Sequence, residues 1–426
     1  MSQVKVHEFP NGVPLASRAA AGAFTRIGPA KRFLIATVEA LCYPVVKGLT
    51  LAGRPRASLS KEPRKILVVE YWNLGDIVIL LPFLRGLRRA YPQAEITLAA
   101  NSRVADILAG QDLVDHLRPV LVPWAQHFSR WKKYNPFSTR WWGLLREILA
   151  LRRECFDLAL SGRMDIRDNL LLWLTGSTRR IGYDVGGGGL FLTDVVQPDL
   201  RHPHRSRVWL RLLDHLARPA QDLLPRLRLG AEQLQFAADF LAANHVGDGE
   251  LLVGVHPGAR VPTRRWGGRN FAEVVARLKG EFPVRFLWFV DPSEELPVDF
   301  PTDLCVPVSL PFREFLAVLG QCRLLICNDS GPMHLATALG VPVVAVFGPQ
   351  KPEWFGPLGD DNRIVMHPEF WCRPCFDYCI FDQPYCLRTI SVDEVVSAAT
   401  AGLRAFAALE GPPLPVIAKP VGGNSG

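Results

Sequence analysis

Residues 65–99 read KILVVEYWNLGDIVILLPFLRGLRRAYPQAEITLA, and this stretch decides the fold class. Residues 65–70 form a short apolar run typical of a buried strand, and a turn over 72–76 follows it. An amphipathic helix is expected over 77–91 and a second strand over 95–99. A strand, a helix and a strand in this order predict a βαβ unit with parallel strands.

The same alternation continues along the chain. The first half adds expected strands at 156–160 and near 180–183 and a helix over 205–217, and a Pro-containing boundary follows at 219–229. In the second half the expected helices are 232–244, 271–278, 312–319 and 332–339, and the expected strands are 251–256, 284–290, 324–327 and 341–347. The sequence therefore predicts an α/β protein with two successive parallel-sheet domains. In such sheets ligands bind beyond the carboxyl ends of the strands.

This pattern divides the chain into four expected parts. They are a basic N-terminal arm with an amphipathic helix (1–62), a first Rossmann-like domain (63–222), a second one (223–410) and a Pro- and Gly-rich disordered tail (411–426). A length of 426 residues agrees with two hydrophobic cores rather than one.

The positive charge is concentrated at the N-terminus. The chain has 49 Lys and Arg against 41 Asp and Glu, and residues 1–65 hold eleven basic and only three acidic side chains. The other 361 residues balance at 38 against 38, whereas a duplex-binding domain needs its basic excess on a folded face. We therefore expect no nucleic-acid partner and favour an anionic membrane surface as the partner of residues 1–62.

Residues 33–52 form an apolar run with one narrow polar stripe. Such a helix either packs over the catalytic domain or lies in a membrane interface, and a true span is least expected because of Glu39, Pro44 and Lys47. The run begins too late for an ordinary signal peptide. We therefore expect a cytoplasmic protein, peripheral at the inner face of the cytoplasmic membrane, with reduced cysteines.

Asn73, Gly75 and Asp76 stand where the first strand turns into the first helix. Asp is a favoured N-cap, and Gly permits a tight turn, so a structural role suffices to explain them. A carboxylate at the mouth of an α/β sheet is also placed to accept a proton from a bound hydroxyl.

Arginines follow a second strand end. After His256 the chain continues through Arg260 to Arg264 and Arg265 before the next helix. Guanidinium groups pair bidentately with phosphate, so this loop is either an anion clamp or a solvated surface run.

Residues 327–334, CNDSGPMH, give the sharpest local signal. The strand ends at Asp329, Ser330 and Gly331 make the turn, and Pro332 suits a first helical position. The free amides of that helix are a ready site for a diphosphate, to which His334 can donate. The chain has neither a P-loop nor a Gly-x-Gly-x-x-Gly fingerprint with these elements, which disfavours an ATPase or a dehydrogenase.

Three stretches resemble the signature blocks of the ADP-heptose lipopolysaccharide heptosyltransferases, the inverting sugar transferases of glycosyltransferase family 9. They are residues 66–96, 256–274 and 328–359, and the resemblance extends from about Lys65 to Leu403. It implies a GT-B architecture, in which two Rossmann-like domains face each other. The N-terminal domain would bind the acceptor, and the C-terminal domain would bind the nucleotide-sugar donor.

The resemblance also implies roles for individual residues. Asp76 would be the base that deprotonates the acceptor hydroxyl, with Asn73 and Gly75 in the acceptor-side loop. The implied donor-side residues are His256, Arg264 in place of a family Lys, Arg265, Asp329, Ser330, Gly331 and His334. The chain departs from the family at 289–295, FVDPSEE, where a Gly-Gly turn is usual, which leaves the ribose or base contact open.

The expected function is transfer of a sugar, most readily heptose from ADP-heptose, onto a lipopolysaccharide core or related lipid-linked saccharide. The alternatives are another sugar from a different nucleotide donor, and a nonenzymatic binding protein of the same fold. No Asp-x-Asp pair offers a metal site, so catalysis without a metal or other cofactor is expected, since arginines and helix amides can neutralise the departing diphosphate.

The last four cysteines form a cluster in sequence. Cys372, Cys375, Cys379 and Cys386 are compatible with four thiolates around a structural Zn²⁺, although their spacing fits standard zinc sites poorly. A thiol-lined turn and a redox role are the other interpretations.

Overall fold

The computed structural model describes residues 29–52, 62–125, 139–199, 201–247, 250–292, 296 and 300–409. Most of the predicted basic arm and the whole predicted tail 411–426 lie outside the described residues. Contacts group the chain into two compact units. The first comprises residues up to Trp72 with Phe83–Ser102 and Val114–Gln221, and the second comprises Asn73–Pro82, Arg103–Leu113 and everything from Asp222 onward.

The first unit is built on a six-stranded parallel sheet in the order β3-β2-β1-β4-β5-β6. The strands are β1 (Lys65–Val69), β2 (Glu95–Ala100), β3 (His116–Pro119), β4 (Leu158–Leu160), β5 (Arg179–Gly182) and β6 (Asp194–Val195). Its helices are α3 (Leu74–Ala90), α4 (Ala105–Leu108), α6 (Thr139–Arg153), α7 (Ile166–Leu174) and α8 (Arg205–His215), of which the start of α3 and all of α4 group with the second unit. Buried residues of β1 and α6, among them Leu67, Val69 and Ile148, share one hydrophobic core.

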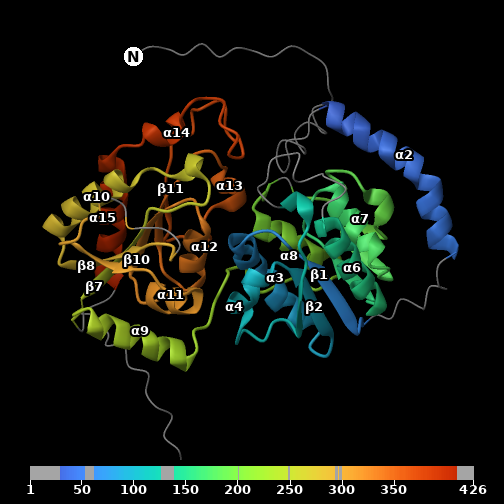
Figure 1. The fold of residues 1–426 in the computed structure, drawn as a ribbon, viewed down its shortest axis with the longest axis horizontal. Coiled ribbons are helices and arrows are strands. Elements are labelled where there is room, and N and C mark those ends of the chain that lie inside the picture. Colours follow the sequence, from blue (N-terminus) through green and yellow to red (C-terminus); the bar gives the residue numbers. More distant parts are fainter. Residues whose placement is uncertain are drawn as a thin grey trace, which may run out of the picture. The chain divides into compact units, whose positions relative to one another are not determined.

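The second unit repeats this plan, with six parallel strands in the order β12-β11-β10-β7-β8-β9. They are β7 (Leu251–His256), β8 (Val284–Phe289), β9 (Cys305–Val308), β10 (Leu324–Asn328), β11 (Val343–Val346) and β12 (Arg363–Val365). Its helices are α9 (Ala231–Ala243), α10 (Gly268–Glu281), α11 (Phe312–Leu319), α12 (Gly331–Ala338), α13 (Pro352–Phe355), α14 (Tyr385–Arg388) and α15 (Val392–Leu409). Figure 1 shows α10 and α15 on one face of the sheet and α11 and α12 on the other.

The predicted α/β class with two parallel sheets is confirmed. Both sheets have the Rossmann order, in which the strand order reverses beside the first strand, here between β1 and β4 and between β7 and β10. Local boundaries differ from the predictions. Helix α3 begins at Leu74 rather than at residue 77, because the apolar pattern misses its polar first turn, and β4 begins at Leu158 rather than at 156.

Helix α2 (Pro29–Ala52) packs on the first unit through a short contact surface. Glu39 Oε1 accepts a 2.5 Å hydrogen bond from the amide of Gly188, and the Ile35 side chain lies against Gly187. Both glycines have positive φ, of 85° and 89°, which favours residues without a Cβ. No helix of the described part of the chain is long and apolar enough to cross a membrane.

Candidate functional site

The candidate site lies in the second unit, where the loops after β7 and β10 meet. Asn328, at the end of β10, links these loops because its Nδ2 donates to Pro257 O at 2.7 Å and its Oδ1 accepts from the Trp266 amide at 3.1 Å. Trp266 is itself buried and donates its Nε1–H to Ile390 O at 3.0 Å. The loop that carries the predicted arginines is therefore held at both ends against the carboxyl edge of the sheet.

Asp329 is the most deeply buried ionisable group of this site, with 3% of its surface exposed. Its Oδ2 has no hydrogen-bond partner among the described residues and lies 3.4 Å from Arg264 Nη1. Burial raises the pKa of Asp329 to about 6; Asp377 adds to this rise, and the cations Arg264 and Arg373 oppose it. The carboxylate is thus positioned to accept one further hydrogen bond from a ligand.

Arg264 joins this carboxylate to a second one. Its Nε and Nη2 each donate to Asp377 at 2.7 Å, so that the pair is bidentate. Burial alone would lower the pKa of Arg264, but the bonds to Asp377 and the charge of Asp329 raise it above its usual value. Arg264 therefore remains a fixed cation between two acids.

Arg260 connects the arginine loop to the turn that carries Asp76. Its Nη1 donates to Asn73 Oδ1, and it interacts electrostatically with Arg264, Asp76 and Asp377. Two guanidinium groups consequently lie near the Asp76 carboxylate within the second unit.

Asp76 occupies the third position of α3 rather than the N-cap that the sequence suggested. Its Oδ2 accepts from the Asn73 amide at 3.0 Å, the reciprocal half of a capping box. Gly75 lies directly against His334, since a Cβ at Gly75 would be 2.8 Å from His334 Cδ2. The turn that carries the predicted base therefore contacts the predicted donor-side histidine.

Helix α12 begins at Gly331, one residue before the predicted start at Pro332. Ser330 precedes it in extended conformation, Pro332 stands in its first turn, and His334 follows in the next position but one. The Ser330 hydroxyl is buried and has no hydrogen-bond partner among the described residues. The amides of this first turn and the hydroxyl are available to an anion.

Two of the predicted donor-side residues, Arg265 and His256, contact residues of their own loop. Arg265 Nε donates to Ala259 O at 2.6 Å, which holds the loop together. His256 ends β7, and its ring packs closely against Gly258. A Cβ at Gly258 would lie only 3.1 Å from the ring. Both residues thus shape the loop that presents Arg260 and Arg264.

The zinc prediction is not supported by the geometry. Within the described ranges, which contain Cys372, Cys375, Cys379 and Cys386, no three His, Cys, Asp or Glu side chains lie where they could hold one metal ion. Burial raises the pKa of Cys375 and raises that of Cys386 to about 11, so both favour the neutral thiol. Cys386 interacts electrostatically with the other three thiols, so the four cysteines lie near one another in the structure as well as in the sequence.

Two residues of the site region, Asp377 and Arg373, were missed by the sequence analysis. Asp377 lies in the cysteine-rich loop, 113 positions from its partner Arg264. Arg373 holds the loop after β11, donating to Gln350 O at 2.8 Å and to His367 O at 2.7 Å.

A second polar cluster lies in the first unit at the carboxyl ends of β1 and β4. Glu70 is buried and accepts three hydrogen bonds of 2.7–3.2 Å from Arg163, whose guanidinium also lies over the Trp72 ring. Tyr71 donates its hydroxyl proton to Asp168 and accepts from Trp124 Nε1 at 2.9 Å. These contacts fix residues 70–72, which lead directly into the Asp76 turn.

Asp168 should make stability depend on pH. Burial raises its pKa to about 7, Asp165 adds to the rise, and Tyr71 and Arg163 oppose it. This pKa exceeds the value of about 3.9 that Asp has in the unfolded chain. The contribution of Asp168 to the free energy of unfolding is therefore fully present below pH ~4 and is lost as pH rises to about 7.

We expect Asp168→Asn to remove this dependence while keeping the bond from Tyr71. The difference between a pKa of about 7 and one of about 3.9 corresponds to roughly 4 kcal/mol. Between pH ~4 and ~8 the free energy of unfolding of the wild type should fall by about this amount relative to that of the variant. Urea unfolding across this range measures the difference. Parallel curves for the two proteins would show that Asp168 does not titrate as described.

The sequence profile described as "Glycosyltransferase family 9 (heptosyltransferase)" matches residues 144–385, more than half of the chain. Lipopolysaccharide heptosyltransferase 1 of Pseudomonas aeruginosa is 26% identical over 372 residues, which cover 80% of this chain and 98% of the relative.

Solved structures show the same fold. A family 9 glycosyl transferase from Veillonella parvula has a TM-score of 0.61 at 22% identity and covers 81% of this chain and 98% of its own. E. coli ADP-heptose lps heptosyltransferase II has a TM-score of 0.59 at 20% identity, and the match covers 80% of this chain and 99% of the E. coli chain. The iron-containing dodecameric glycosyltransferase TibC of enterotoxigenic E. coli has a TM-score of 0.50 at 14% identity, covering 81% and 77%.

Proposed function

The chain belongs to glycosyltransferase family 9, and from this premise we propose that it transfers heptose from ADP-heptose, with inversion, onto a lipopolysaccharide core or related lipid-linked saccharide. The observation that carries the proposal is the contact of the Gly75–Asp76 turn with His334, beside the Arg264 and Asp329 pair. This arrangement brings a carboxylate, fixed cations and the free amides of α12 into one region of the second unit.

Asp76 acts as the general base in this mechanism. Its carboxylate, oriented by the Asn73 amide, takes the proton from the acceptor hydroxyl as the oxygen attacks the anomeric carbon. The new glycosidic bond forms on the face opposite the diphosphate, and the bond from carbon to the diphosphate oxygen breaks with its electron pair. A single displacement of this kind inverts the configuration, as in other inverting glycosyl transfers.

The departing ADP is stabilised by groups that are already in position. Arg260 and Arg264 supply positive charge, and the first turn of α12 with the Ser330 hydroxyl supplies hydrogen-bond donors. Asp329, which has an unused oxygen, accepts from a donor hydroxyl or amino group rather than binding phosphate.

We further propose that catalysis needs no metal, since these cations and amides can neutralise the leaving group. The iron of TibC is a property of that protein. The basic arm 1–62 and α2 place the enzyme at the inner face of the cytoplasmic membrane, where a lipid-linked acceptor is accessible.

A donor panel tests this function. Purified full-length protein is offered ADP-heptose and ADP-, UDP- and GDP-hexoses, each with and without EDTA, and thermal stabilisation and donor hydrolysis are measured. We expect a selective response to ADP-heptose that EDTA leaves unchanged. Selectivity for a UDP-sugar would replace heptose by another sugar, binding without turnover of any donor or acceptor would favour a binding protein, and loss with EDTA would contradict metal independence.

A further inference from the structure

Helix α6 of the first unit carries an apolar stripe that its packing does not use. Its inner face is formed by Leu144, Ile148 and Leu151, which are buried in the core of the unit. Its outer face should then be polar, as in an ordinary surface helix. Instead Trp142, Leu145 and Leu149 are 68%, 45% and 48% exposed.

These three residues lie on one line. At 100° per residue they fall within roughly 60° of each other, and their centre is roughly 125° from that of the buried face. Single exposed apolar residues are common, but three at helical spacing form a continuous ridge. The ridge is therefore a second apolar face on the same helix.

Positive charge borders this ridge. Arg146, whose side chain is 82% exposed, and the exposed Arg153 lie next to the ridge on the helix surface, each within roughly 40° of Trp142 at 100° per residue. The one acid of α6, Glu147, pairs with Arg146 at 3.4 Å and points away from the ridge by helical position. From residue 126 to 153 the sequence has seven Lys or Arg and only this Glu, a local excess of six that the even balance of the chain after residue 65 conceals.

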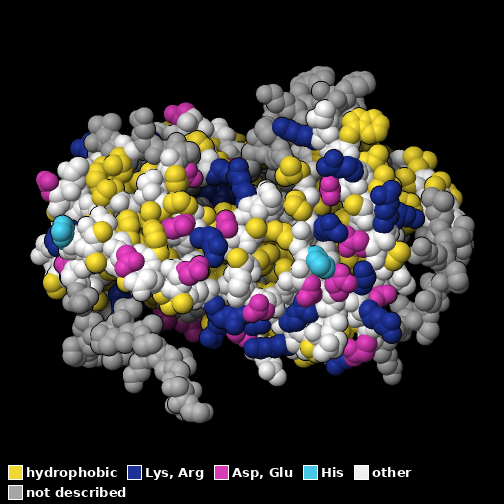
Figure 2. All heavy atoms as spheres, turned by 60° about the horizontal axis from the view of Figure 1, so that its bottom comes forward, with side chains coloured by type: hydrophobic (Ala, Val, Ile, Leu, Met, Phe, Trp, Pro, Cys, Tyr) yellow, Lys and Arg dark blue, Asp and Glu magenta, His cyan; other side chains and the backbone are white. Residues whose placement is uncertain are grey.

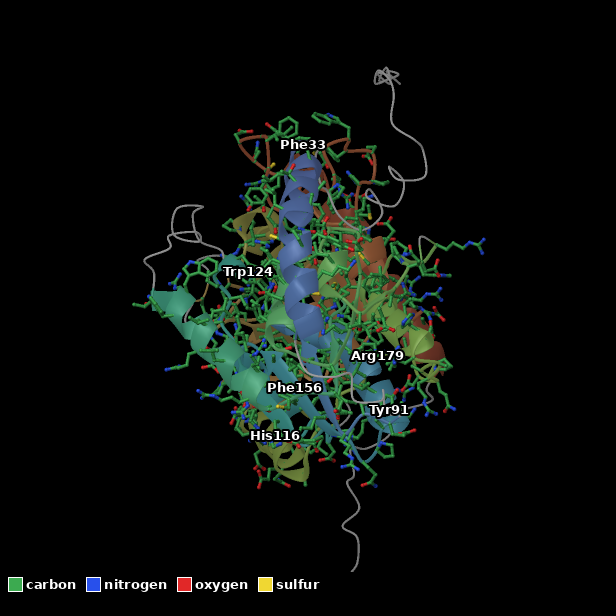
Figure 3. All side chains as sticks on the ribbon, turned by 90° about the vertical axis from the view of Figure 1, so that its right-hand side faces the viewer. Phe33, Tyr91, His116, Trp124, Phe156 and Arg179 are labelled. Carbon is green, nitrogen blue, oxygen red and sulfur yellow. The ribbon has the colours of Figure 1, made fainter. Side chains whose placement is uncertain are left out.

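Helix α6, which carries the ridge, lies on the same side of the first unit as α2. Helix α6 contacts α7, α7 contacts the 3₁₀ turn Gly189–Phe191, and that turn contacts α2. Figure 3 looks onto this side and shows both helices, with Phe33 at one end of α2. The outer face of α2 is also apolar, since Phe33 and Leu41 are 77% and 71% exposed.

We propose that the α6 ridge is a second membrane-docking element, which inserts Trp142, Leu145 and Leu149 into the interface of an anionic bilayer. This deepens the membrane association proposed above, and it assigns to the folded unit a contact that the N-terminal arm alone does not provide. A bilayer fits better than a protein partner because aromatic and aliphatic side chains bordered by arginines suit both the acyl boundary and anionic headgroups. Figure 2 shows hydrophobic side chains exposed on the described surface among Lys, Arg, Asp and Glu side chains.

The test uses full-length protein and vesicles of phosphatidylcholine, alone or mixed equally with phosphatidylglycerol. Three variants are compared in co-sedimentation: Trp142→Ser with Leu149→Gln on the α6 ridge, Phe33→Gln with Leu41→Gln on α2, and Leu234→Gln as a control on exposed α9. Donor hydrolysis monitors the integrity of the fold, since none of these residues belongs to the catalytic region.

The α6 variant should bind mixed vesicles about tenfold more weakly than wild type, because two apolar side chains no longer enter the interface. A fourth variant, Arg146→Gln, should weaken binding to mixed vesicles but not to neutral ones. The Leu234 variant should bind like wild type.

Three results would overturn the inference. Unchanged binding of the α6 variant alongside weakened binding of the α2 variant would leave the proposed association to α2 alone. Wild type that sediments with neither vesicle would refute the membrane association altogether, while the transferase activity stands or falls with the donor panel. Self-association without vesicles that the α6 variant abolishes would assign the ridge to a second copy of the chain.

Discussion

Asp76→Asn is expected to lower kcat by about a thousandfold, because asparagine keeps the shape of the side chain but cannot take the acceptor proton. The Asn73 amide still finds an oxygen acceptor at this position, so that the turn should keep its conformation. Affinity for ADP should change little, since the variant leaves Arg264 and α12 intact. Steady-state kinetics and calorimetric titration with ADP separate the two effects.

The matched control is Asp303→Asn, which changes an exposed acid elsewhere in the second unit and should retain full activity. Wild-type turnover by the Asp76 variant would reject this residue as the base. Inactivity of both variants would point to a general loss of charge or stability rather than to proton transfer.

Arg264→Ala is expected to lower kcat/KM by about two to three orders of magnitude, because it removes a fixed cation beside the departing diphosphate. It also leaves Asp329 and Asp377 without the guanidinium that lies between them. Repulsion between these acids should raise the pKa of Asp329 further and weaken anion binding. ADP affinity should therefore fall together with turnover, which distinguishes this variant from Asp76→Asn.

Arg264→Lys sharpens the experiment. Lysine restores the charge but cannot bind Asp377 through two parallel bonds, so we expect intermediate activity. Arg313→Ala, which removes an exposed arginine of α11, is the control and should behave like wild type. Full activity of Arg264→Lys would show that charge alone matters and that the bidentate bond to Asp377 does not.

The sequence predicted the local parts of the site better than their long-range partners. Asp329 and His334 were recognisable because a strand end, a turn and a helix start follow one another within six residues. Asp377 was not, since its role depends on Arg264, which is 113 positions away, and its loop contains no periodic pattern.

The sequence analysis also missed the edge strands and one apolar helix face, for two further reasons. The edge strands β3, β6, β9 and β12 have two to four residues each, too few to show a pattern, and β3 is almost entirely exposed. The α6 ridge was missed because an amphipathic pattern is normally interpreted with one apolar face, whereas α6 has two. Only the folded core distinguishes the face that is buried from the face that is left outside.

The repeated strand order has an evolutionary consequence. Two six-stranded sheets with one connectivity are what duplication of an ancestral domain would leave in a single chain. Equivalent loops have since acquired different side chains: the loop after β1 leads to Asp76, whereas the loop after β7 holds Arg264. On this view the two copies diverged in the charge of the loops that follow the carboxyl ends of their first strands.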